Sequence, residues 1–132
     1  MSDVEIIARE ATPNDRAYVA MTWMKSWAND MGSGSRRRKA EDKFLADEIH
    51  PTLDAQPTIW VLCSRSSPRT LHGYAVVQNG VLCWVYVARA LRGMGLARRG
   101  IEAALGGYPD DILVRHKWPW PSRRFRHAQR AA

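Results

Sequence analysis

The sequence predicts an α/β fold with a mixed sheet, in which the first strands are antiparallel and the last two form a parallel pair around a crossover helix. Two apolar runs flank Asn79-Gly80, and both of these residues tolerate the positive φ of a tight hairpin turn, so the runs should be antiparallel partners. A helical segment then separates the second run from a last short strand. That connection is typical of a right-handed crossover between parallel strands.

The N-terminal part should contain one strand and two helices. A strand is expected at residues 4–8, and Thr12-Pro13 begins a helix as N-cap and first-turn proline. Helical spacing predicts a buried stripe of Ala17, Ala20, Met21, Met24, Trp27 and Ala28. After a Gly/Ser break, a second helix is expected at residues 36–49, burying Phe44, Leu45 and Ile49. His50-Pro51 should end it, because a residue before proline avoids the helical region.

The C-terminal part should supply the remaining strands. β-branched and aromatic runs predict strands at residues 58–64, 71–78 and 81–88, with a turn at 65–68. The spacing of apolar residues predicts a helix over residues 96–105, closed by Gly106-Gly107. A final strand is expected at 111–115. We therefore expect one domain over residues 1–115, followed by a basic tail at 116–132.

Composition excludes several classes of protein. The 132 residues contain 20 Lys and Arg against 13 Asp and Glu, and 45% are hydrophobic, which is typical of one folded domain. Cys63 and Cys83 form no CxxC and have no suitably spaced histidine, so no metal site and a reducing, cytoplasmic location are expected. No apolar run is long enough to span a membrane, and Asp3, Glu5 and Arg9 interrupt any signal peptide.

The segment from Arg92 to Ala97 lies where a strand gives way to a helix. Backbone amides in the first helical turn lack intrahelical partners and carry positive partial charge, so they favour a phosphate or diphosphate. Gly93 and Gly95 would let such a ligand approach closely; alternatively, they only permit a tight turn. A P-loop is excluded because Leu96-Ala97 replaces Lys-Ser/Thr, and a dinucleotide fingerprint is excluded because its third glycine is Arg98.

This segment, Arg-Gly-Met-Gly-Leu-Ala, resembles the acyl-CoA signature Arg/Gln-x-x-Gly-x-Gly/Ala of the GCN5-related N-acetyltransferases. The hairpin around Asn79-Gly80 and the order of elements are also similar to that family, although its usual Pro and Tyr are Arg89 and Leu91 here. The resemblance implies an acyl-CoA-dependent N-acyltransferase that uses acetyl-CoA and a small-molecule or protein amine. It further implies that the donor is bound by Val85, Tyr86, Val87, Arg92, Gly93, Met94, Gly95, Leu96 and Ala97.

The resemblance implies direct attack of an amine on the thioester, which requires removal of a proton. The family often uses a glutamate on the fourth strand and a tyrosine after the fifth, and this sequence has neither. Tyr86, Ser122 and His72 are the substitutes it offers. A non-catalytic acyl-CoA-binding module is therefore an alternative function.

Several other side chains could have either a role in the site or a purely structural one. Arg98 or Arg99 could reach the 3′-phosphate of CoA or could simply be solvated. Asp47, Glu48 and His50 could border the acceptor site or form a solvated helix end. Residues with aromatic rings could line an acceptor pocket or form core, namely Trp23, Trp27 and Trp60.

The C-terminal end from Arg115 onward carries most of the net positive charge of +7. Its basic residues are Arg115, Lys117, Arg123, Arg124, Arg126 and Arg130, and Arg36-Arg37-Arg38-Lys39 forms a second cluster. The tail could bind nucleic acid or an acidic partner, which makes a nucleic-acid-associated protein a further alternative, or it could be a solvated terminus. It is too short for the helix and two strands that complete the family fold, so a homodimer or an open sheet edge is expected.

Overall fold

The structure is a computed structural model that describes residues 5–29, 32–116 and 124–127. The chain divides into two compact units, one formed by residues 1–10 and 58–132 and the other by residues 11–57. Each unit is considered by itself below. Within the described ranges, no helix combines the length and apolar character needed to cross a membrane.

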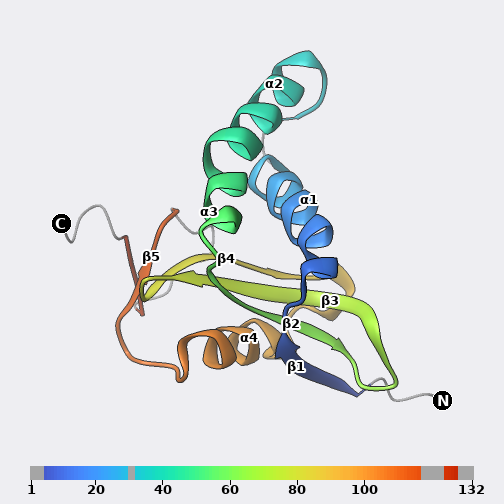
Figure 1. The fold of residues 1–132 in the computed structure, drawn as a ribbon, viewed down its shortest axis with the longest axis vertical. Coiled ribbons are helices and arrows are strands. Elements are labelled where there is room, and N and C mark those ends of the chain that lie inside the picture. Colours follow the sequence, from blue (N-terminus) through green and yellow to red (C-terminus); the bar gives the residue numbers. More distant parts are fainter. Residues whose placement is uncertain (1–4, 30–31, 117–123, 128–132) are drawn as a thin grey trace. The chain divides into compact units, whose positions relative to one another are not determined.

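The first unit is built on a six-stranded sheet whose strand order follows the sequence. The strands are β1 (Ile6–Glu10), β2 (Thr58–Ser64), β3 (Ser67–Gln78), β4 (Val81–Val87), β5 (Ile112–Val114) and β6 (Phe125–His127) (Figure 1). The first four strands are antiparallel, and β4 and β5 are parallel. This confirms the predicted mixed sheet. The short β6 was not predicted, and it pairs parallel with β5, so the chain itself supplies a strand beside that edge.

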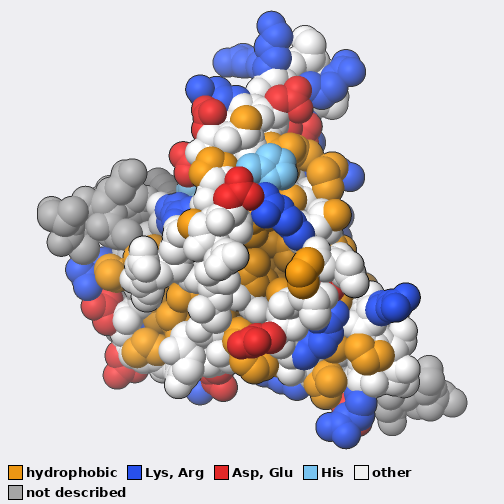
Figure 2. Space-filling view, in the orientation of Figure 1, with side chains coloured by type: hydrophobic (Ala, Val, Ile, Leu, Met, Phe, Trp, Pro, Cys, Tyr) orange, Lys and Arg blue, Asp and Glu red, His pale blue; other side chains and the backbone are white. Residues whose placement is uncertain are grey.

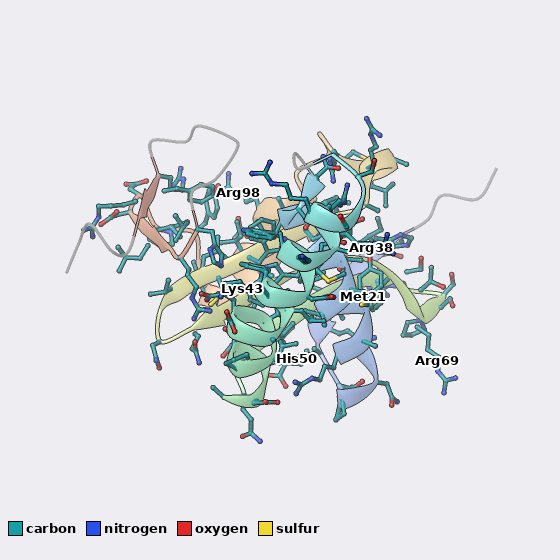
Figure 3. The ribbon with its side chains drawn as sticks, turned by 90° about the horizontal axis from the view of Figure 1, so that it is seen from above. Met21, Arg38, Lys43, His50, Arg69 and Arg98 are labelled. Carbon is teal, nitrogen blue, oxygen red and sulfur yellow. The ribbon has the colours of Figure 1, made fainter. Side chains whose placement is uncertain are left out.

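The central hairpin forms as its turn residues predict. Asn79 and Gly80 have φ angles of 53° and 76°, and Gln78 lies opposite Val81. The predicted turn at 65–68 was too long, because β3 already begins at Ser67 and includes Pro68. The Pro68 carbonyl accepts hydrogen bonds from the Arg9 guanidinium, at 2.9 Å from Nη2 and 3.3 Å from Nε. This early part of β3 is exposed, and Arg69 projects from it (Figure 3).

Helix α4 (Leu96–Leu105) has the predicted bounds and crosses one face of the sheet (Figure 1). Gly95 and Gly106 flank it with φ angles of 75° and 79°, the left-handed conformation that favours glycine. Its apolar side packs into a core with β3, β4 and β5, made of Ala75, Val77, Leu82, Val85, Ile101, Ala104, Ile112 and Val114. These contacts fix the position of α4 on the sheet.

The second unit begins with a 3-10 turn (Pro13–Asp15) and α1 (Arg16–Trp27). The backbone N–H of Thr12 donates to the Asp15 carboxylate at 2.7 Å, which satisfies one donor at the start of the helix. The predicted buried stripe was partly wrong. Val19 and Trp23 are fully buried, whereas Ala17 and Met21 are exposed, so the buried stripe follows Val19 and Trp23 together with Ala20 and Met24.

The next helix continues through the proline that was expected to end it. Helix α2 (Ser35–Phe44) runs into a π-helical turn (Leu45–Ile49) and then into α3 (His50–Asp54). His50 is helical at φ −61° and ψ −44°, and its N–H donates to Leu45 five residues back. We attribute the tolerance of Pro51 to this wider turn, since it alters the position of the carbonyls that a proline ring would otherwise meet.

Aromatic stacking holds the helices of the second unit together. Phe44 stacks on Trp27 with ring centroids 3.9 Å apart and meets Trp23 edge-on at 6.3 Å. Phe44 and Ile49 are buried as predicted, and Leu45 is only partly buried. Trp23 and Trp27 therefore act as packing residues, and a role for them in the acceptor site stays a prediction.

Candidate functional site

Strands β4 and β5 run together only over a short distance. Val81 and Leu82 are opposite Leu113 and Val114, and the Arg115 N–H donates to the Leu82 carbonyl at 2.9 Å. Strand β4 then continues to Val87, with no described part of β5 beside it. The pairing thus joins the first two residues of β4 to the last two residues of β5, and β4 extends five residues beyond it.

A β-bulge at Cys83 changes the direction of the backbone groups of β4. Val77 lies opposite Leu82 and Val76 opposite Trp84, which leaves Cys83 as the extra residue. Before the bulge, the Leu82 carbonyl faces β5. After it, the Ala88 N–H faces β3 and donates to the His72 carbonyl at 2.7 Å.

The alternation of a strand then determines which amides of β4 face away from β3. They face the space beside β4 beyond the end of β5, which is called the gap below. Since Ala88 faces β3, Trp84 and Tyr86 do so as well, and the backbone groups of Val85 and Val87 face away from β3. Beyond Leu82, the described residues place no strand beside this outer edge of β4. It offers N–H and C=O groups with the spacing of a strand.

Gly73 brings β3 unusually close to β4 at this edge. A Cβ atom at Gly73 would overlap the Tyr86 carbonyl oxygen and lie 3.2 Å from Val87 Cα. Only glycine therefore fits at this position. The role of Gly73 has no local signal in the sequence, because nothing in its spacing shows which backbone it must approach.

The loop after β4 leads to an exposed turn at the start of α4, residues 93–97, which is called the glycine corner below. A 3-10 turn (Arg89–Leu91) precedes Gly93 and Gly95, whose φ angles are 84° and 75°. A Cβ atom on either glycine would meet nothing within 4 Å, and Met94 between them is 63% exposed. The first hydrogen bond of the helix joins Arg99 N–H to Gly95 O, so the amides before it lack such partners.

Arg92 links this loop back to the end of β4. Its Nε donates to the Val87 carbonyl at 3.0 Å. The guanidinium therefore lies between the outer edge of β4 and the glycine corner, two places that the sequence analysis assigned to one ligand.

The two arginines at the start of α4 have protein partners. Arg98 donates to Glu102 at 2.6 Å and lies over the Tyr108 ring, with 4.7 Å from Cζ to the centroid. Arg99 donates to the Ile6 carbonyl at 2.6 Å and so attaches α4 to β1. A contact of either one with a 3′-phosphate stays a prediction, and it would compete with these bonds.

The residues predicted for catalysis and for the acceptor site each have contacts within their own unit where the structure describes them. His72 Nε2 lies 2.7 Å from Ser64 Oγ, and Tyr86 stacks on Tyr74 with ring centroids 5.7 Å apart. Ser122 lies outside the described residues. His50 and Asp47 belong to the second unit, where His50 lies 3.3 Å from Arg16 and Asp47 accepts from Lys43 at 2.9 Å.

Both cysteines are reduced and buried. Burial raises the pKa of the Cys83 thiol, and the nearby positive charge of Arg115 opposes that shift. Cys83 is therefore a protonated group in the bulge rather than a nucleophile. In the ranges that the structure describes, no cluster of histidine, cysteine or carboxylate side chains could hold a metal ion.

Three of the tail cations are used within the first unit. Arg115 donates to Gln78 at 2.5 Å, Arg124 to the Pro109 carbonyl at 2.8 Å, and Arg126 to Asp111 at 2.8 Å. The remaining tail cations, Lys117, Arg123 and Arg130, lie outside the described residues. Nucleic-acid binding by the tail and a homodimer both stay predictions.

The second basic cluster lies at the start of α2, where blue side chains gather in Figure 2. Arg36, Arg38 and Lys39 are exposed. Arg37 is partly buried and donates to the Gly32 carbonyl at 2.8 Å. A solvated helix end is sufficient to explain this cluster.

Comparison with known proteins supports the fold. No family model matches the sequence, and no curated protein is significantly similar to it. The structure is similar to apo YjaB from Escherichia coli, with a TM-score of 0.53 and 17% identity over 77% of this chain and 65% of that one. It is equally similar to a GNAT-family acetyltransferase from Brucella melitensis in complex with acetyl-CoA, with a TM-score of 0.53 and 16% identity over 79% and 68%.

The chain therefore has the fold of GNAT acetyltransferases, as the sequence resemblance implied. It spans about two thirds of the length of these two neighbours.

Proposed function

We propose that this protein is an acyl-CoA-dependent N-acyltransferase, which transfers an acetyl group from acetyl-CoA to an amine by direct attack. One observation carries the proposal: β4 parts from β5 next to an open, glycine-flanked helix start. The gap offers a strand edge, and the corner offers amides with positive partial charge. A long ligand with amide groups at one end and a diphosphate at the other matches both.

Acetyl-CoA would lie first along the outer edge of β4 and then at the glycine-flanked start of α4. Pantetheine amides would pair with the outward groups of Val85 and Val87 as a further strand would, whereas the backbone of Tyr86 faces β3. The diphosphate would accept hydrogen bonds from the amides of residues 93–97. The Arg92 guanidinium, held at Val87, would add positive charge between the two.

A pair of glycine variants tests the position of the diphosphate. Gly95→Glu places a negative side chain in the corner and should abolish acetyl-CoA binding in isothermal titration calorimetry. Gly106→Glu is the matched control, since Gly106 has nearly the same φ angle and equally open surroundings at the other end of α4. Equal affinity of the two variants would show that the corner does not hold the donor.

Thiol release tests the transfer itself. Acetyl-CoA is incubated with aliphatic amines, an aminoglycoside and peptides with free N-termini, and free CoA is measured. Release that depends on one class of amine supports the transferase.

A non-catalytic acyl-CoA-binding module is the second candidate, and the absence of any carboxylate on β4 favours it. Binding without release for every amine would support this function instead. Loss of donor binding itself would reject both.

A further inference from the structure

An imidazole stands where β4 and β5 part. His116 directly follows Arg115, which makes the last hydrogen bond from the end of β5 to β4. Its ring meets Trp84 edge-on, with centroids 5.9 Å apart and an interplanar angle of 68°. Trp84 is the first residue of β4 after the bulge. His116 is thus fixed against the strand at the point where the gap opens.

The other titratable groups around the gap are poorly suited to accept a proton. The Cys83 thiol on β4 keeps its proton near neutral pH, because burial raises its pKa. The Tyr86 ring is stacked on Tyr74. Arg115, beside His116, is permanently charged. Asp111 precedes the opposite end of β5 and is bound by Arg126, which lowers its pKa.

We propose that His116 is the general base that accepts a proton from the acceptor amine. This inference rests on the transferase function proposed above. Imidazole is the side chain that changes its protonation between pH 5 and 8, so its neutral form can take a proton from an ammonium group. The sequence analysis did not select His116, because its position beside Trp84 follows only from the pairing of β4 with β5.

The proposed step balances as follows. Neutral His116 removes one proton from the ammonium group, and the amine lone pair forms the C–N bond to the thioester carbonyl. The C–S bond breaks as the tetrahedral intermediate collapses, and the second proton of the nitrogen passes to the departing thiolate. The products are an amide, free CoA thiol and a protonated imidazole, which then loses its proton to water.

The surroundings of the ring suit this step. The side chain is half-buried, and its Nε2 is shielded from bulk solvent. Under the proposal, the acceptor amine that reaches the thioester is the group that exchanges a proton with this ring.

The kinetic test compares His116→Gln with His72→Gln. CoA release from acetyl-CoA is measured from pH 5.5 to 9, with the amine class that wild type accepts. His116→Gln should lower the rate at pH 7 by about 10²- to 10⁴-fold and remove the acidic limb of the profile. Its affinity for acetyl-CoA should change less than twofold. The inference is overturned if His116→Gln keeps the limb, or if His72→Gln removes it instead.

A spectroscopic test works on the unmodified protein. The imidazole signal of His116 is assigned by NMR from its absence in His116→Gln and followed during titration with acetyl-CoA and with CoA. It should shift with both ligands, and differently with acetyl-CoA because the acetyl group adds contacts near the ring. Binding without a shift would overturn the role of His116 and leave the transferase intact. A protein that binds no acetyl-CoA, or transfers to no amine, would overturn both.

Discussion

Gly73 in β3 and Gly100 in α4 differ in what an added methyl group would contact. A Cβ at Gly73 would overlap backbone atoms of β4, which cannot move without breaking the pairing of β3 and β4. A Cβ at Gly100 in α4 would lie 3.6 Å from Ala75 Cβ, which is ordinary contact. The two positions therefore predict opposite effects of one substitution.

Gly73→Ala should lower the free energy of unfolding by about 1–3 kcal/mol, because the strands must separate to admit the methyl group. Gly100→Ala should leave it unchanged or raise it by up to about 1 kcal/mol, because alanine favours helix. Urea denaturation of both variants measures the difference. A Gly73→Ala protein as stable as wild type would mean that β3 and β4 lie farther apart at this point.

At the scale of elements, one side chain links the loop after β4 to the strand. The Arg92 guanidinium bonds the Val87 carbonyl and is otherwise exposed, so it contributes to the geometry of the loop more than to folding. Arg92→Met should weaken acetyl-CoA binding about 10- to 150-fold, since a hydrogen bond to a charged group contributes roughly 1.5–3 kcal/mol.

Calorimetry and thermal unfolding check this prediction together. The midpoint of unfolding should change little, and Arg92→Lys should restore only part of the affinity because it retains the charge without the planar fork. A variant that binds as wild type does would show that Arg92 has no part in holding the donor.

The pairing of β5 with β6 includes a pH-dependent contact. Arg126 donates two hydrogen bonds to Asp111, at 3.1 and 2.8 Å, and this lowers the pKa of the carboxyl. A lowered pKa in the folded state stabilises the fold above the ordinary carboxyl pKa of about 4, and that contribution is lost as the pH falls through the lowered value.

Arg126→Gln should therefore reduce stability slightly at pH 7, and this difference should disappear as the pH falls through the lowered pKa of Asp111. Both groups are exposed, so the effect should also shrink in high salt. Thermal unfolding of the variant and wild type across this range gives the comparison. A difference that persists at the acidic end would point to packing by the Arg126 side chain as its source.

Local sequence patterns predicted the bounds of some elements correctly. They failed where contacts with residues distant in the sequence determine the structure. The bounds of β2 and α4 follow from their own composition and flanking residues, such as Gly95 and Gly106. The bulge at Cys83 and the pairing of β6 depend on partners elsewhere in the chain, and no local pattern encodes them. The prediction that His50-Pro51 ends the helix was wrong, because the π turn before Pro51 depends on the whole helix rather than on the dipeptide.

For the molecule as a whole, the candidate site depends on three elements that are separate in sequence. The glycine corner of α4 was predictable, because its motif is contiguous and carries its own backbone requirements. The gap has no local signal in the sequence, since its geometry follows from where β5 stops pairing with β4. His116 could not be selected from sequence for the same reason.

Amide hydrogen exchange, read residue by residue with NMR, tests the central claim most directly. In the free protein, the amides of Trp84, Tyr86 and Ala88 should exchange slowly because they face β3, and that of Val85 should exchange faster. Saturating acetyl-CoA should slow exchange at Val85 and at residues 93–97, as pantetheine and diphosphate accept or shield these donors. Unchanged exchange at Val85 and the glycine corner in the presence of bound acetyl-CoA would contradict the account.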